Sequence, residues 1–206
     1  MPCAEAQARG VRRGSSHLAF SANPADLRPA PPAPARGVDL TKDAAQTTTL
    51  YLLCGKIAAG KSTLARRLAA RPATLLISQD HWMSTLFTSD DLRTIEDYAR
   101  LSGRLRAAMG PHIVDVLRQG LSVVLDFPAN TAGDRAWMRG MIGEAGVAHE
   151  MHLLDVPDAI CKQRLRQRNA DGVHPYQVDD ATFDLFTSYF VPPAPAEGFD
   201  VVVHTD

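Results

Sequence analysis

The chain has 206 residues, a formal net charge of −1 and a hydrophobic content of 45%, which is enough for one domain with a full core. The near-neutral balance gives no overall attraction to nucleic acid or to an anionic membrane. No apolar run approaches the ~20 residues that a membrane span needs. Cys3, Cys54 and Cys161 share no metal-ligand or redox spacing, so we expect reduced thiols and a cytoplasmic protein.

The first 46 residues differ in composition from the rest of the chain. They are rich in Ala, Pro and Arg, and they contain almost no large apolar side chains. Such a segment cannot bury enough surface to offset the entropy lost on ordering it. We therefore expect residues 1–46 to be a disordered extension, or the product of a mis-assigned start site, and residues 47–206 to form the ordered domain.

Short apolar runs alternate with helical patterns through the ordered part. Strands are predicted at residues 49–54, 74–78, 121–125, 147–154 and 199–203. Helices are predicted at 61–71, from a cap at 89–91 to 119 with an interruption at 110–111, at 133–145, from 157 onward, and at 179–190. This alternation predicts an α/β fold, with a parallel sheet sandwiched by helices. Right-handed crossovers place the carboxyl ends of all strands at one edge, where ligands bind.

The first predicted strand leads directly into a glycine-rich motif, Gly-x-x-x-x-Gly-Lys-Ser, which a helical pattern follows at once. This is a P-loop in its required context of strand, loop and helix. Its glycines let backbone N–H groups surround a phosphate, and the helix N-terminus adds partial positive charge. Lys61 would reach the β- and γ-phosphates, and the Ser62 hydroxyl would bind Mg²⁺. The predicted ATP-binding residues are Gly55, Lys56, Ile57, Ala58, Ala59, Gly60, Lys61, Ser62 and Thr63.

Two aspartates follow predicted strands and are candidates for the chemistry of phosphoryl transfer. Asp126 comes directly after the run 121–125, which is a Walker B pattern, and it would hold Mg²⁺ directly or through water. Asp80 comes just after the run 74–78 and is followed by His81. Asp80 is the candidate general base for an acceptor hydroxyl, with His81 as the alternative. Either aspartate could instead cap the next loop.

Arginines on the helix that begins near Pro157 are candidates for a lid. Arg164 and Arg168 are four residues apart, so they share one helix face, whereas Arg166 points elsewhere and should be exposed. Two guanidinium groups beside the polar stretch 169–177 are typical of a lid that closes over ATP phosphates. A solvated basic helix face is the alternative.

The remaining candidates are less specific. His149 and His152 are three residues apart on a predicted strand, so they face opposite sides and cannot form a metal pair. Four large side chains either line an acceptor pocket or pack in the core: Trp82, Met83, Phe87 and Trp137.

The order of these motifs resembles that of the small P-loop kinases. The branch is that of the AAA-domain-like predicted kinases, near the chloramphenicol phosphotransferase, zeta-toxin and polynucleotide 5′-kinase groups. The stretches 126–131 (Asp-Phe-Pro-Ala-Asn-Thr) and 164–169 (Arg-Leu-Arg-Gln-Arg-Asn) are especially similar to that branch. The similarity covers residues 48–204. It implies a five-stranded parallel sheet in the order 2-3-1-4-5, a helical lid after strand four, and a role for Asp80 on the acceptor hydroxyl.

Other P-loop classes fit less well. The Asn-Lys-x-Asp motif of GTPases is absent, and no acidic residue follows Asp126 to activate a water, as a motor-type ATPase requires. We expect a kinase that uses ATP and Mg²⁺, with catalytic residues Lys61, Asp80, Arg164 and Arg168, acting on a hydroxyl of a small molecule as a monomer or weak dimer. Two alternatives stay open, a polynucleotide or nucleoside kinase, and an ATP-binding switch with slow hydrolysis.

Overall fold

The structure is a computed structural model, and it describes residues 19–20, 47–172 and 176–205. Most of the predicted extension, residues 1–46, therefore lies outside the described residues. Two of its residues are described: β1 (Ala19–Phe20) pairs antiparallel with β6 (Tyr176–Gln177).

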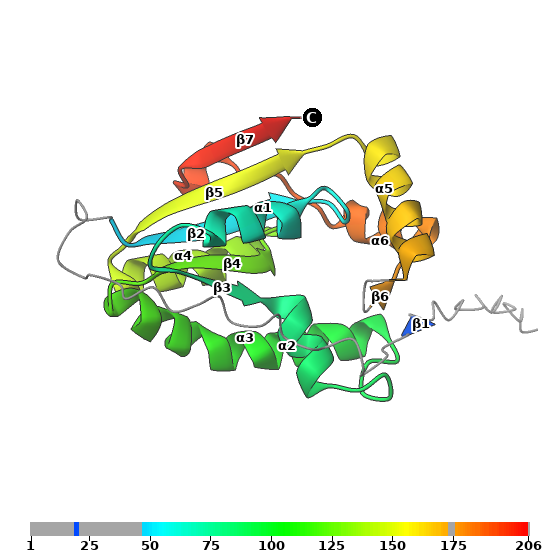
Figure 1. Ribbon diagram of the computed structural model, residues 1–206, viewed down its shortest axis with the longest axis horizontal. Helices are drawn as coiled ribbons and strands as arrows, with labels where there is room; N and C mark the ends of the chain where they lie inside the picture. The colour runs from blue at the N-terminus through cyan, green and yellow to red at the C-terminus, as the bar shows by residue number, and fades with distance from the viewer. Residues whose placement is uncertain (1–18, 21–46, 173–175, 206) are drawn as a thin grey trace, which may run out of the picture.

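All strands of the central sheet run parallel, and their arrowheads point the same way in Figure 1. In spatial order they are β3 (Thr74–Ser78), β4 (Ser122–Pro128), β2 (Thr49–Gly55), β5 (Ala148–Asp155) and β7 (Val201–Thr205). This order confirms the predicted topology 2-3-1-4-5. Every residue of the central strand β2 is buried, which explains why it reads as a continuous apolar run.

Helices cover both faces of the sheet, and successive residues of β2 divide between the two resulting cores. Leu50 and Leu52 pack with side chains of α3 and α4, whereas Tyr51 and Leu53 pack with α1, α5 and α6, because neighbouring strand residues point to opposite faces. The helices are α1 (Lys61–Ala69), α2 (Gln79–Leu86), α3 (Ile95–Arg118), α4 (Ala132–Ala145), α5 (Asp158–Asp171) and α6 (Asp180–Ser188).

Helix α3 corrects two predictions. It begins at Ile95 after the N-cap Thr94, and not at the cap predicted at 89–91, and it continues without interruption through Gly110 and Pro111. Pro111 lies on the exposed side, where water can bond the carbonyl group that loses its N–H partner. A Cβ on Gly110 would lie 3.3 Å from the Trp137 indole nitrogen, so the glycine allows close packing of α3 on α4.

Two shorter segments also differ from expectation. Helix α2 follows β3 directly, with Ser78 as its N-cap, so Asp80 lies in a first helical turn and not in a loop. Helix α5 continues to Asp171, so it includes the first three residues of the stretch 169–177 that was predicted as a loop. Figure 1 shows α5 and α6 together beyond the carboxyl end of β5. Within residues 47–172 and 176–205, no helix is both long and apolar enough to span a bilayer.

Candidate active site

The loop between β2 and α1 has a backbone that favours glycine at two positions. Gly55 has φ 152° and Gly60, the N-cap of α1, has φ 105°, both outside the range that other residues readily adopt. A Cβ on Gly55 would lie 3.0 Å from the Leu154 carbonyl oxygen, so a side chain there would clash with β5. The Gly55 N–H donates to Asn130 Oδ1 at 2.9 Å, which fixes the loop against the segment that follows β4.

The side chain of Lys61 lies along the inner side of this loop. Its Nζ donates to the carbonyl oxygens of Gly55 at 2.6 Å and Lys56 at 2.7 Å. Burial lowers the pKa of Lys61, although the carboxylates of Asp126 and Asp80 oppose the shift. The amine is thus held by the P-loop and lies in the field of both aspartates.

Asp126 lies within β4, near the strand's carboxyl end, where it pairs in register with Ser78 of β3. Its carboxylate accepts a hydrogen bond from the Ser62 hydroxyl. Burial raises the pKa of Asp126 despite that hydrogen bond, and the nearby charge of Asp80 raises it further. The carboxylate and the hydroxyl are therefore neighbours, and both supply oxygen atoms of the kind that bind Mg²⁺.

Asp80, in the first turn of α2, lies opposite the P-loop. Burial raises the pKa of Asp80, and the positive charges of Lys61 and Arg168 oppose this shift. The register pair Ser78–Asp126 explains the proximity of the two aspartates, because Asp80 follows Ser78 by two residues. The sheet topology thus brings together carboxylates from two segments that lie far apart in the sequence.

Both arginines predicted for the lid line the same cleft from α5, and the third does not. Arg166 is exposed and forms an ion pair with Asp180. Arg168 Nε and Nη2 are buried without a hydrogen-bond partner among the described residues, and burial lowers the Arg168 pKa. An arginine whose donors lack acceptors is suited to bind an anion, because an unmade buried hydrogen bond is costly.

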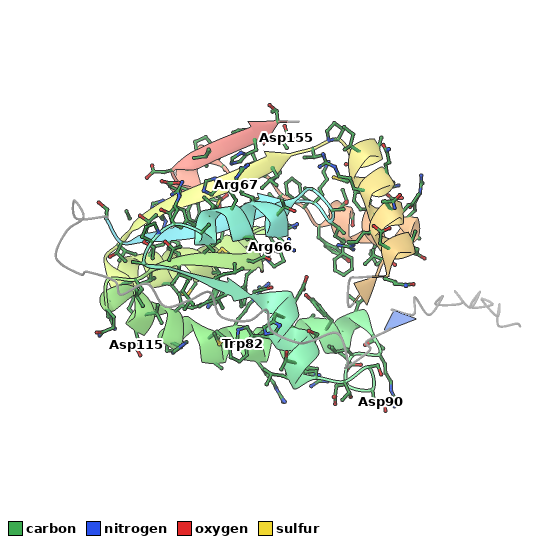
Figure 2. All side chains as sticks on the ribbon, viewed as in Figure 1. Arg66, Arg67, Trp82, Asp90, Asp115 and Asp155 are labelled. Carbon is green, nitrogen blue, oxygen red and sulfur yellow. The ribbon has the colours of Figure 1, made fainter. Side chains whose placement is uncertain are left out.

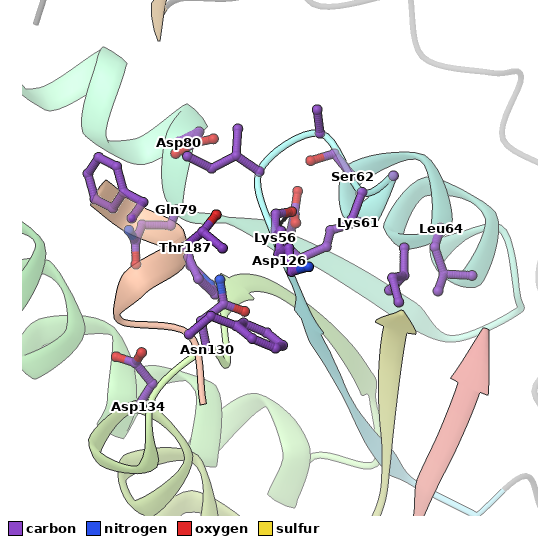
Figure 3. A pocket seen from close by; sticks show the side chains of 18 of the residues that line it. Lys56, Lys61, Ser62, Leu64, Gln79, Asp80, Asp126, Asn130, Asp134 and Thr187 are labelled. Carbon is purple, nitrogen blue, oxygen red and sulfur yellow. Dashed lines mark hydrogen bonds between the residues drawn. The ribbon is translucent and has the colours of Figure 1, made fainter. Parts of the chain in front are cut away.

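A cleft of about 1240 Å³ joins these side chains. In Figure 3, Lys61, Ser62 and Asp126 lie toward α1, and Gln79, Asp80 and Asn130 lie on the other side. The cleft is therefore large enough to hold a nucleotide and a second small molecule, since ligand sites commonly measure about 300–1,000 Å³.

The sequence matches the profile of a family described as AAA domain over residues 50–193. The chain belongs to the AAA domain family. No curated protein matches the sequence.

Solved structures share the fold of this AAA domain. A candidate kinase from Chloroflexus aurantiacus matches with a TM-score of 0.62 at 24% identity, covering 78% of this chain and 89% of that one. A sugar kinase from Janibacter sp. HTCC2649 matches with a TM-score of 0.56 at 14% identity, covering 78% and 86%. The APS kinase CysC of Mycobacterium tuberculosis, solved with AMPPNP and APS, matches with a TM-score of 0.52 at 19% identity, covering 77% and 88%. The AAA domain thus has a P-loop kinase-like fold.

The residues of this AAA domain fit a magnesium ion better than a structural zinc ion. Within the described ranges, no group of three or more His, Cys, Asp or Glu side chains could hold a metal. Mg²⁺ needs no such cage, because one or two side-chain oxygens and the substrate phosphates usually hold it. The adjacent oxygens of Ser62 and Asp126 would be such ligands, and a bound cation would lower the pKa of Asp126, which burial raises.

Several residues that the sequence suggested for the acceptor lie elsewhere. The large side chains proposed as its lining are absent from the cleft: Met83 is fully buried, Trp137 stacks near Phe127 with ring centroids 5.7 Å apart, and Trp82 on α2 is 38% exposed (Figure 2). His81 is exposed and also lies outside the lining. Of the two candidates for the acceptor hydroxyl, only Asp80 therefore faces the cleft.

His149 and His152 have different neighbours, which agrees with the prediction that they face opposite sides of β5. His149 Nε2 accepts the Asp200 N–H at 3.2 Å. His152 Nδ1 lies 2.9 Å from His204 Nε2.

The sequence analysis missed the polar wall that faces the P-loop. This wall consists of Gln79, Tyr98, Arg106, Asn130 and Asp134. One local signal was readable: Thr131 and Asp134 have the spacing of a capping box, which the structure shows at the start of α4. Their contacts with Arg106 and Gln79 join distant segments and have no sequence signature.

Proposed function

We propose that this protein is an ATP- and Mg²⁺-dependent kinase that transfers the γ-phosphoryl group to a hydroxyl of a small molecule. The observation that carries the proposal is the convergence of Lys61, Asp80, Asp126 and Arg168 on one cleft beside the P-loop. Together with the P-loop, these residues would bind the phosphates of ATP, provide oxygen ligands for a cation and place a carboxylate beside the acceptor hydroxyl. The arginine would donate hydrogen bonds to the oxygens of the transferred phosphoryl group. Phosphoryl transfer needs these parts, because positioning and charge neutralisation dominate its catalysis.

The P-loop would hold the phosphates of ATP. Residues of the P-loop and of the first turn of α1 line the cleft, so their backbone N–H groups would surround the phosphates, and Lys61 would exchange its carbonyl partners for phosphate oxygens. Ser62 and Asp126 would hold Mg²⁺, which neutralises phosphate charge when bound. Arg164 and Arg168 would contact phosphate oxygens from α5, where the two buried nitrogen atoms of Arg168 gain acceptors.

Asp80 would orient the acceptor hydroxyl and accept its proton. A raised pKa brings the carboxyl group closer to neutral pH, which favours general-base catalysis. The required basicity is modest, because a loose transition state needs little proton removal before transfer. The proposal includes an enzyme that acts as a monomer or weak dimer in the cytoplasm, where thiols such as Cys54 and Cys161 stay reduced.

One contact gives some support to an ATP-binding switch. Lys56 of the P-loop forms an ion pair with Asp158 in the first turn of α5. A change at the loop could therefore reach the lid helix, and a partner could respond to it. A switch should hydrolyse ATP slowly and leave no phosphorylated acceptor.

The test is transfer from γ-labelled ATP to a panel of hydroxyl-bearing metabolites, antibiotics and oligonucleotides. Lys61→Ala should abolish labelling or ATP binding and leave the circular dichroism spectrum unchanged, because it removes one amine from the cradle. Lys162→Ala is the matched control, since Lys162 of α5 pairs with Asp184 of α6 and is not among the residues that line the cleft. Wild-type turnover in a folded Lys61→Ala variant would refute the nucleotide assignment.

A further inference from the structure

The two halves of the cleft differ in charge. Cationic side chains of the P-loop, α1 and α5 line the nucleotide half: Lys56, Lys61, Arg66, Arg67, Arg164 and Arg168. On the opposite wall, Arg106 is the one Lys or Arg among the lining residues that the structure describes. Whether this wall presents a positive charge to an acceptor therefore depends on the hydrogen bonds and ion pairs of Arg106.

Arg106 is already neutralised by a partner in its own wall. Its Nη1 donates to Asp134 Oδ1, and its Nε donates to Gln79 Oε1 at 3.3 Å. The guanidinium also lies 5.8 Å from the centre of the Trp137 ring. The Gln79 amide is 1% exposed and donates from Nε2 to Tyr98 Oη at 2.8 Å. This network fixes the orientation of Arg106 and leaves its charge balanced.

Asp134 is held as firmly as its partner. It occupies the third position of α4, where its Oδ2 accepts from the Thr131 N–H at 3.1 Å and from Thr131 Oγ1 at 2.8 Å. The Asp134 side chain is only 14% exposed, and that of Arg106 is 23% exposed. A phosphate group arriving at this wall would meet a fixed carboxylate, and would have to separate a largely buried ion pair to reach the guanidinium.

We propose that the acceptor is an uncharged hydroxyl compound and that Asp134, by neutralising Arg106, selects against phosphorylated acceptors. The rest of the cleft agrees with this class, because aromatic side chains from α3, α6 and the segment after α6 also line it: Tyr98, Phe186, Tyr189 and Phe190. Such rings favour a ligand with a flat apolar face and neutral polar groups. This inference rests on the proposed kinase function and disfavours a polynucleotide acceptor.

The test compares matched acceptors that differ by one phosphate. Adenosine is paired with 3′-AMP and ribose with ribose 5-phosphate, and a 5′-hydroxyl oligonucleotide serves as a polyanion. For each, kcat/KM is measured with saturating Mg²⁺ and ATP. In the wild type, the uncharged member should have the higher kcat/KM in a pair. Asp134→Asn should shift this ratio toward the phosphorylated member by at least about tenfold, because it removes a repulsive charge while asparagine oxygen can still accept from Thr131.

Asp97→Asn is the matched control. Asp97 occupies the third position of α3, bonds the N-cap Thr94 and pairs with Arg100, but lies outside the cleft. Its variant should keep the wild-type ratio. The inference would be overturned if the wild type preferred the phosphorylated members, or if it hydrolysed ATP but accepted no uncharged member. It would also be overturned if Asp134→Asn had the same ratio as the wild type. Loss of both ATP binding and hydrolysis would instead refute the kinase function itself.

Discussion

Burial works against the charged forms of the three groups at the centre of the cleft. It raises the pKa of Asp80 and Asp126 and lowers that of Lys61, and the attraction between them offsets the shifts only in part. Burying each of these charged groups therefore lowers the stability of the folded protein. Such a loss of stability is common at sites where side chains are placed to bind a ligand. Bound nucleotide and cation would supply the missing partners, so both should stabilise the protein.

Burial also disfavours the charged form of His152 on β5, which is not among the residues that line the cleft. Burial, the neighbouring His204 and the cationic Arg71 and Arg67 lower the pKa of His152 from 6.5 to about 4. The folded state therefore keeps this imidazole neutral at pH values where the unfolded state protonates it. Between pH 6.5 and about 4 the unfolded state binds more protons, so stability is lost as the pH falls through this window.

Replacing His152 should remove this pH dependence. Melting temperatures measured from pH 7 to pH 4.5 should fall more steeply for the wild type than for His152→Gln. The difference should be at least about 2 °C, the shift that ~1 kcal/mol produces in a domain of this size. His112→Gln is the control, because His112 is exposed on α3. Parallel curves for the wild type and His152→Gln would contradict the assignment.

At the scale of the element, α5 shows why helical spacing is informative. Arg164 and Arg168 are one turn apart and both line the cleft, whereas Arg166 lies on the outer face with Asp180. The helical spacing alone predicts this division. It could not predict that two nitrogen atoms of Arg168 are buried without partners, because that depends on the packing of α5 against the sheet.

The lid can be tested with three equal substitutions on one helix. Lysine keeps the charge of arginine but loses the planar, bidentate donor set. Arg164→Lys and Arg168→Lys should therefore each lower kcat/KM for ATP by at least about tenfold, or roughly 1.4 kcal/mol. Arg166→Lys should retain wild-type values. Full activity in both cleft variants would show that the face is merely solvated.

Other elements show where local patterns fail. Pro111 indicated a break in α3, yet its ring lies on the exposed side and the helix continues. The polar run 89–91 indicated a cap, but the helix begins after Thr94, whose hydroxyl accepts the Asp97 N–H. Capping residues and proline therefore indicate where a helix can begin or break, but the packing of the helix in the fold overrides such local preferences.

At the scale of the whole molecule, the order of the strands determines which residues can meet. The P-loop, the alternation of strands and helices, and the family resemblance together predicted the parallel sheet 2-3-1-4-5 and the shared edge for Asp80 and Asp126. Contacts such as Gly55 with Asn130, 75 residues apart, and Arg106 with Asp134 depend on loop conformations that no short pattern encodes. The P-loop side of the cleft was therefore predicted from the sequence, and the residues of the opposite wall were not.

The most direct measurement is a Mg²⁺ titration of phosphoryl transfer in the wild type, Asp80→Asn and Asp126→Asn. If Asp126 serves the cation, its variant should need more Mg²⁺ for half-maximal rate and should be partly rescued by excess metal. If Asp80 serves the acceptor, its variant should be slower by roughly 10²–10⁴-fold, with ATP affinity and Mg²⁺ dependence almost unchanged. A shifted Mg²⁺ optimum for Asp80→Asn with none for Asp126→Asn would reverse the two roles, and wild-type rates in both variants would contradict the proposed site.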